Sequence, residues 1–336
     1  MPNQFKLEPF NPGWGMGSSH IQTILGKYAR GATAGIVFHR RRIETPDGDF
    51  FDLDFPEIAG LPLDETTPIV LLLHGLEGHS RRGYMCQTYR LLARQGIRSA
   101  GMNFRSCSGE MNRQPWSYHA GATEDVALAF DMLEEWHPGV SKGLIGFSLG
   151  ANLALKYLGE RGEGVRPSLQ AAVAISPPFD LAQSAVEMQK GIKRVYGRMF
   201  LNSIRSKMQT KADLVRPVTD LEQIMAAQSV YEFDNLWTAP IHGFRDADDY
   251  YAQCSSGSYL AGIRVPTLIL RAIDDPMFAP QDIPFDVIQA NPSLYTGITQ
   301  RGGHLGFIEG RPGHFSCWAE RQASRFTTLF VKDAAQ

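Results

Sequence analysis

The segment Gly146-Phe147-Ser148-Leu149-Gly150 holds a serine whose surroundings are typical of a nucleophile. A serine on a sharp strand-to-helix turn needs glycine two residues before it and two after, because side chains there would collide with the neighbouring strand and helix. Such a turn exposes the Ser148 hydroxyl and places the Leu149 N–H at a helix N-terminus, where negative charge is stabilised. The same pentapeptide also occurs in glycine-rich loops, so its meaning depends on partners elsewhere in the chain.

An acid and a histidine that could activate Ser148 follow it in the sequence, in the order serine, acid, histidine. The apolar run 267–270 predicts a buried parallel strand, and Asp274 and Asp275 follow at its carboxyl end, where open α/β sheets keep their active sites. His304 lies in a glycine-flanked loop that could bring its imidazole to the serine. We expect Asp275 to hold His304, and Asp274 to bond local backbone N–H groups or water.

A second glycine turn could supply the other donor for an oxyanion. The strand-like run 68–73 leads into His74-Gly75-Leu76, and we predict that the Leu76 N–H joins the Leu149 N–H in binding negative charge. For His74 we favour a role in bracing this loop over a catalytic one. Backbone donors of this kind cannot be deleted by changing a side chain.

Composition and length exclude several function classes. The chain has 336 residues, of which 43% are hydrophobic and 20% charged, with a net charge of −2 and a pI of about 6.5. These values argue against disorder and against nucleic acid as a partner. The four cysteines lack the paired spacing of zinc sites and disulfide scaffolds, and no nucleotide-binding motif occurs, so we expect neither metal nor cofactor. Without a signal-like or membrane-spanning apolar run, we expect a cytoplasmic protein.

Alternating apolar patterns predict the α/β fold class. Strands are expected at 36–45 and 50–55 as a leading pair, then at 68–73, 97–104, 143–145, 171–176, 267–270 and 294–299. Two of the intervening helices are marked by apolar residues on one face, Met85, Tyr89 and Leu92 in the first and Val126, Phe130 and Leu133 in the second. This alternation implies a mostly parallel sheet with helices on both faces.

Residues 177–261 interrupt the alternation and are too many for an ordinary connection. We expect them to form a helical cap, inserted in a core made of residues 1–176 and 262–336. An apolar stripe within the cap includes Met199 and Phe200, which we predict to bind the substrate. Basic residues crowd the same region: Lys190, Lys193, Arg194, Arg198, Arg205, Lys207, Lys211 and Arg216. They form either a solvated face or a surface for anionic lipid head groups.

These motifs together resemble the YheT-like branch of the α/β-hydrolases, which includes eukaryotic ABHD lipid hydrolases and plant embryogenesis-associated esterase-like proteins. The matching stretches are residues 19–25, 74–78, 103–105, 107–110, 118–121, 146–158, 176–180, 238–240, 243–244, 274–276 and 302–307. The resemblance implies the α/β-hydrolase fold and a triad of Ser148, Asp275 and His304. Ser106 departs from it, because the branch usually has glycine at this position.

The residues and the resemblance predict a serine hydrolase that acts on carboxylic esters, lipid-like acyl esters included, through an acyl-enzyme. The expected partner is therefore a small acyl ester. Two alternatives use the same triad, a thioesterase and a perhydrolase. A third alternative is a non-enzymatic scaffold with this fold, since a fold does not by itself determine function.

Overall fold

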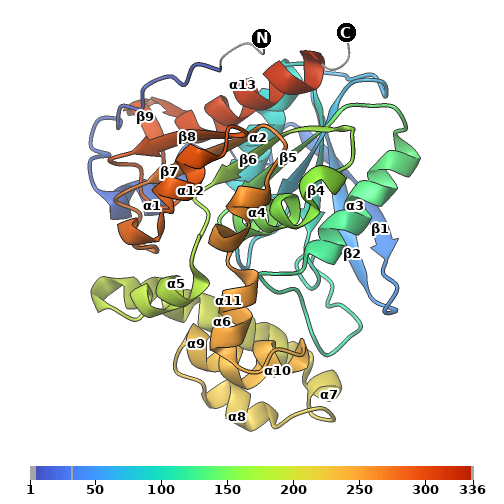
Figure 1. Ribbon diagram of the computed structural model, residues 1–336, viewed down its shortest axis with the longest axis vertical. Coiled ribbons are helices and arrows are strands. Elements are labelled where there is room, and N and C mark those ends of the chain that lie inside the picture. The colour runs from blue at the N-terminus through green and yellow to red at the C-terminus, as the bar shows by residue number, and fades with distance from the viewer. Residues whose placement is uncertain (1–4, 32, 334–336) are drawn as a thin grey trace.

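An eight-stranded sheet crosses the centre of the molecule (Figure 1). The computed structural model describes residues 5–31 and 33–333. In spatial order the strands are β1 (Ile36–Glu44), β2 (Phe50–Ile58), β4 (Arg98–Asn103), β3 (Ile69–Leu73), β5 (Lys142–Phe147), β6 (Leu169–Ile175), β7 (Thr267–Ala272) and β8 (Leu294–Thr299). The β1–β2 and β2–β4 pairs are antiparallel, and all later pairs are parallel. The structure therefore confirms the predicted leading pair and the mostly parallel sheet.

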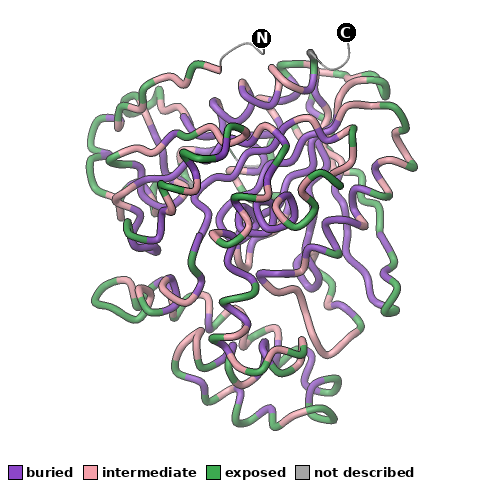
Figure 2. The backbone as a smooth tube through the Cα atoms, viewed as in Figure 1, coloured by how far each residue is buried: buried purple, intermediate pink, exposed green. Residues whose placement is uncertain are grey.

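Both faces of the sheet are covered because its central strands are apolar on both sides. In β3, Leu71 and Leu73 pack in the core on one face, whereas Val70 and Leu72 pack on the other. This alternation follows from the two-residue repeat of a strand. Helices α3 (Thr123–Trp136) and α4 (Leu149–Arg161) cover the first face, and α2 (Gly83–Arg94) and α13 (Trp318–Asp333) cover the second. Figure 2 shows buried backbone concentrated in these central strands.

The carboxyl ends of the parallel strands carry the segments that hold the predicted site residues. Ser148 follows β5, Leu76 follows β3, Asp275 follows β7 and His304 follows β8. The remaining elements of the core are α1 (Ser19–Ala29), α12 (Phe285–Ala290) and a separate hairpin of β9 (Ile308–Arg311) and β10 (His314–Cys317). The hairpin packs beside α1 and carries the chain from the His304 loop to α13.

A run of helices connects β6 to β7, and Figure 1 shows it on one side of the sheet. We keep the name cap for residues 177–261, the range predicted from the sequence. Its helices are α5 (Leu181–Glu187), α6 (Arg194–Thr210), α7 (Ala212–Val215), α8 (Leu221–Ala226), α9 (Val230–Phe233), α10 (Ala239–Ile241) and α11 (Ala247–Cys254). Leu201, Met208, Phe233 and Trp237 belong to a buried cluster within the cap itself.

Candidate active site

The turn at Ser148 has the strained geometry that its glycines predict. Ser148 has φ +53° and ψ −118° and is followed at once by α4. A Cβ on Gly146 would lie 2.2 Å from the carbonyl oxygen of Gly150, and a Cβ on Gly150 would lie 2.4 Å from that of Leu73. Neither position can therefore carry a side chain, and this explains the two glycines that flank Ser148.

Ser148, His304 and Asp275 form a continuous hydrogen-bonded chain. The His304 Nε2 lies 2.9 Å from the Ser148 Oγ, and the His304 Nδ1 lies 2.8 Å from the Asp275 Oδ2. All three side chains are largely buried. The His304 backbone N–H donates to the Thr23 Oγ1 of α1 over 2.9 Å, which fixes the loop that carries the imidazole. A serine, a base and an orienting carboxylate are thus in place for nucleophilic attack.

The two adjacent aspartates have different partners. The Asp274 Oδ1 accepts a hydrogen bond of 2.9 Å from the Gly303 N–H, so Asp274 holds the glycine turn before His304. Asp275 is buried, and burial acts to raise its pKa, but His304 and the guanidinium of Arg271 outweigh this effect and hold its pKa below the usual value. Asp275 is therefore ionised beside the imidazole, and Asp274 supports the loop.

Arg271 is a component of the site that the sequence analysis did not single out. Its side chain is fully buried at the end of β7, where its Nη1 donates to the Asp275 Oδ2 over 2.6 Å. Its Nη2 also donates to Asp282 over 3.3 Å, and its guanidinium lies 4.7 Å from the ring centre of Phe278. A charged residue within a strand that is otherwise apolar was the signal in the sequence. Arg271 offsets the charge of Asp275 and fixes its orientation.

Leu76 and Leu149 both lie on the wall of the cavity that contains Ser148. No hydrogen bond from either N–H to another group is found among the residues described. His74 does not face the triad. Its Nδ1 donates to the Gly75 carbonyl over 2.7 Å and its Nε2 accepts from the Phe104 N–H over 3.3 Å, while burial lowers its pKa to about 3. This neutral ring fixes the loop that carries Leu76.

Glu77 joins this loop to the cap. Its carboxylate accepts hydrogen bonds from the Tyr118 hydroxyl over 3.0 Å, from the Ser203 hydroxyl over 2.5 Å and from the Lys207 ammonium over 2.9 Å. Ser203 and Lys207 belong to α6, so one buried carboxylate connects the segment after β3 with a cap helix. Glu77 immediately follows Leu76, and the position of the Leu76 N–H therefore depends on this junction.

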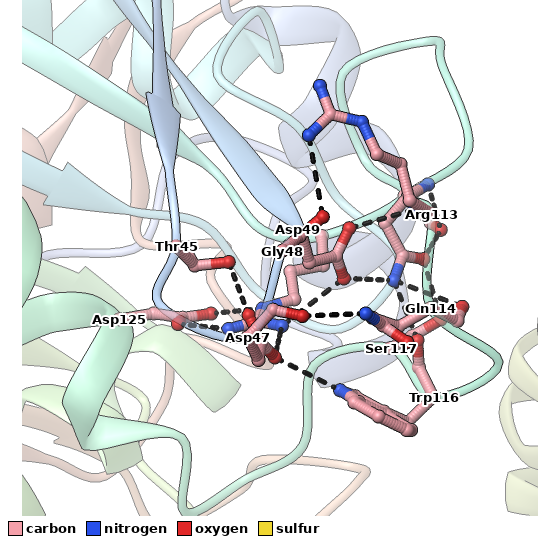
Figure 3. Close-up of polar contacts among 12 residues, drawn as sticks. Thr45, Asp47, Gly48, Asp49, Arg113, Gln114, Trp116, Ser117 and Asp125 are labelled. Carbon is pink, nitrogen blue, oxygen red and sulfur yellow. Dashed lines mark hydrogen bonds and ion pairs between the residues drawn. The ribbon is translucent and has the colours of Figure 1, made fainter.

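A buried polar network fixes the segment 105–118, which supplies part of the cavity wall (Figure 3). The Arg105 guanidinium binds Asp125 through two hydrogen bonds of 2.7 and 2.8 Å and also contacts Asp47 and Asp49. Ser106 has φ +62°, a conformation that glycine adopts without strain, and its hydroxyl bonds the Asn112 side chain. The positive φ agrees with the glycine that the resemblance implies at this position.

The cavity next to Ser148 encloses about 1130 Å³ of empty space, its open mouth included. Most of its lining is apolar and comes from the cap, Phe200 and Ile204 of α6 among others. Met199 is not among the residues that line the cavity, and 61% of its surface is exposed. The structure therefore places Phe200 on the wall but not Met199, because one helical position rotates a side chain by about 100°.

The basic residues of the cap do not form one continuous face. Lys207 turns inward to Glu77, and Lys211 is buried, where it donates to Asn112, Trp116 and Ser117. Lys190 and Lys193 both pair with Glu187. Among the described residues, no group of histidine, cysteine, aspartate and glutamate side chains has the arrangement of a metal site.

Comparison with known proteins places the chain in a family. The alpha/beta hydrolase fold family matches residues 68–311. The YheT protein of Escherichia coli is 35% identical over 96% of this chain and 94% of its own length. The monoacylglycerol lipase of Saccharomyces cerevisiae is 31% identical over 82% of this chain and 62% of its own, and the mouse phospholipase ABHD3 is 29% identical over 94% and 77%.

Among solved structures, the Pyrococcus furiosus esterase Pf2001 superposes with a TM-score of 0.52 over 91% of each chain, at 15% identity. This likeness supports the fold alone. The family match over residues 68–311 and the identity to YheT agree with the resemblance noted in the motifs. The chain belongs to the α/β-hydrolase fold family, in the branch that contains YheT and the ABHD3 phospholipases.

Proposed function

We propose that this protein hydrolyses carboxylic esters through a covalent acyl-enzyme on Ser148. The observation that carries the proposal is the chain of two hydrogen bonds from Ser148 through His304 to Asp275, at the wall of an apolar cavity. The named activities of the relatives, a monoacylglycerol lipase and a phospholipase, are both ester hydrolyses and support the same reaction class.

The mechanism follows from the positions of these groups. The Ser148 Oγ attacks the acyl carbonyl while the His304 Nε2 takes its proton, and ionised Asp275 stabilises the imidazolium that forms. The Leu76 and Leu149 N–H groups would bind the oxyanion of the tetrahedral intermediate. His304 then gives its proton to the leaving alcohol, and water, deprotonated by the same imidazole, hydrolyses the acyl-enzyme.

The direct test is hydrolysis of a p-nitrophenyl ester series by the purified wild type and by Ser148→Ala. We expect the variant to lose at least about 10³-fold in kcat, because a triad that lacks its nucleophile retains only the contributions of binding and the oxyanion donors. Ser99→Ala, a buried serine on β4 outside the cavity, is the matched control and should keep its activity. Equal loss in both variants, or full activity in Ser148→Ala, would refute the proposal.

We also propose that one face of the protein contacts anionic lipid. Around the start of α6, the exposed apolar residues Val186, Ile192, Val195 and Met199 alternate with Arg194, Arg198 and the two lysines that share Glu187, Lys190 and Lys193. The His20 Nδ1 bonds the Tyr196 hydroxyl over 2.9 Å, which brings α1, with exposed Ile21, Ile24 and Leu25, beside this surface. Apolar residues mixed with cations are typical of surfaces that lie on anionic membranes.

Flotation with vesicles tests this contact. We expect binding to vesicles of phosphatidylcholine mixed with phosphatidylglycerol, weaker binding to phosphatidylcholine alone, and loss of binding in the double variant Ile192→Asp, Val195→Asp. Val37→Asp, an equally exposed valine on the edge strand β1, serves as the control for added negative charge. If the control loses as much binding as the double variant, the contact does not involve the face around α6.

The described part of the chain contains no helix long and apolar enough to span a bilayer. We propose a cytoplasmic location on a separate observation, namely that Cys86, Cys107, Cys254 and Cys317 are all free and buried thiols. Binding to lipid would then occur from that compartment.

A further inference from the structure

A buried carboxylate, Asp234, lies on the wall of the cavity, and no cation among the described residues is paired with it. Asp234 begins the π-helical turn η3 (Asp234–Thr238) and is only 9% exposed. Its Oδ1 accepts a hydrogen bond of 2.6 Å from the Thr238 hydroxyl, and its Oδ2 accepts one of 2.7 Å from the Tyr251 hydroxyl. Both donors are neutral, and no described arginine, lysine or histidine forms an ion pair with Asp234. Short π-helical turns are frequent at functional sites.

This arrangement costs stability. Burial raises the pKa of Asp234 to about 6, and the two hydroxyl groups only partly oppose the shift. The group is therefore mostly ionised at neutral pH, although a buried charge without a partner is unfavourable. Other buried carboxylates of this protein do have cations beside them, as Asp275 has Arg271 and Asp125 has Arg105. A buried carboxylate without a cation is expected at a cavity wall if its partner is a bound ligand.

The surroundings of Asp234 suit a positive charge. Trp237, Tyr250 and Tyr251 line the same cavity, and the ring centres of Tyr250 and Tyr251 are 5.2 Å apart. Aromatic faces attract cations, and quaternary ammonium groups are the ligands most often bound in this way. A carboxylate among aromatic rings offers both attractions at once.

The cations that share this cavity are occupied elsewhere. Lys207 is held by Glu77 at 2.9 Å. Lys211 donates to the Asn112 Oδ1, the Trp116 carbonyl and the Ser117 hydroxyl, so all three of its N–H groups have acceptors. The cavity histidines, His119 and His242, are kept neutral because burial lowers the pKa of both. None of these groups neutralises Asp234.

We propose that Asp234, Trp237, Tyr250 and Tyr251 form a subsite that binds an ammonium group carried by the ester substrate. The proposal rests on the proposed function, because the reacting serine opens into the same cavity. It makes the enzyme selective for esters with a cationic end over neutral esters of equal size.

The test compares esters that differ only in charge. Butyrylcholine and 3,3-dimethylbutyl butyrate have nearly the same shape. The alcohol part of the first ends in a positively charged trimethylammonium group, and that of the second ends in a neutral tert-butyl group. The p-nitrophenyl esters of 4-trimethylammoniobutyrate and 5,5-dimethylhexanoate form a second pair, in which the charged or neutral group lies at the end of the acyl chain. In at least one pair we expect the wild type to prefer the cationic ester by about tenfold or more in kcat/KM, which corresponds to about 1.4 kcal/mol.

Asp234→Asn keeps the size of the side chain and removes its charge, and we expect the preference to fall close to one. The ratio within a pair is the readout, because a general loss of activity cancels in it. Asp248→Asn, which removes an exposed carboxylate from the neighbouring helix α11, should leave the ratio unchanged. If Asp234→Asn does not fold, Trp237→Leu tests the same subsite without a change in charge and should lower the ratio.

The inference fails if the wild type shows no preference in either pair, or if Asp234→Asn retains the preference. Hydrolysis of p-nitrophenyl butyrate, an uncharged ester, separates this failure from that of the proposed function. A wild type that cleaves this ester at Ser148 but does not distinguish the charged from the neutral esters retains its function and lacks the subsite. The melting temperature provides a further check, because a purely structural Asp234 would make Asp234→Asn less stable at neutral pH, whereas removal of an unpaired charge would not.

Discussion

Ser148 adopts a backbone conformation that costs a non-glycine residue of the order of 1–3 kcal/mol. The fold maintains it because β5 and α4 are both buried and leave no room for another path between them. The strain exposes the hydroxyl to the cavity and brings it within 2.9 Å of the His304 imidazole. The side chains of the site are held in place by the residues that contact them, as Arg271 holds Asp275.

The first prediction concerns the two adjacent carboxylates. Asp275→Asn should lower kcat by about 10⁴-fold, because the neutral amide cannot stabilise the imidazolium and favours the wrong tautomer of the histidine. Asp274→Asn should cost far less, since its role is to accept the Gly303 N–H and an amide oxygen can do the same. The measurement is kcat of both variants, compared at equal melting temperature. A larger loss of kcat in Asp274→Asn than in Asp275→Asn would assign the acid to Asp274.

The sequence was sufficient to predict that Ser148, Asp275 and His304 lie together, because turn and strand-end positions have strong local signals. Glycine spacing marked Ser148, and the end of an apolar strand marked Asp275. The partners of Arg271 and Glu77 could not be predicted in this way. Glu77 meets Ser203 and Lys207, which lie 126 and 130 residues away, and only the packing of the cap onto the loop brings them together.

Among the elements, α6 determines how the cap meets the cavity. Its buried or half-buried side shows Tyr196, Phe200 and Ile204, spaced four residues apart, whereas Val195 and Met199 face outward. Helical periodicity predicted one apolar stripe in this segment, but the structure divides it between the interior and the surface. The helical repeat alone cannot show which face of a helix packs against the protein when apolar residues lie on both faces.

This division makes Phe200 and Met199 a matched pair for the second prediction. Phe200→Ala enlarges the cavity and should shift the preferred acyl chain by at least two carbons towards longer p-nitrophenyl esters. Met199→Ala changes only an exposed side chain and should leave the preference as it is in the wild type. The measurement is kcat/KM across the p-nitrophenyl ester series. An equal shift in both variants would show that Phe200 does not limit the length of the acyl chain.

Over the whole molecule, the alternation of strands and helices was enough to predict the parallel sheet and its covered faces. The sequence analysis did not assign α1, the β9–β10 hairpin or α13, because these elements are fixed by contacts between distant parts of the chain. The Trp318 Nε1 donates to the Glu8 carbonyl across 310 residues, and the Gln22 side chain donates to the Ile308 carbonyl across 286. These contacts join the two ends of the chain around the loop that carries His304.

The account as a whole depends on Ser148 as the nucleophile. Incubation with a fluorophosphonate probe, followed by protease digestion and mass spectrometry, identifies the modified residue directly. We predict one adduct per chain, on the peptide that contains Ser148, with labelling slowed when a p-nitrophenyl ester competes. An adduct on any other residue, or undiminished labelling of Ser148→Ala, would contradict the account.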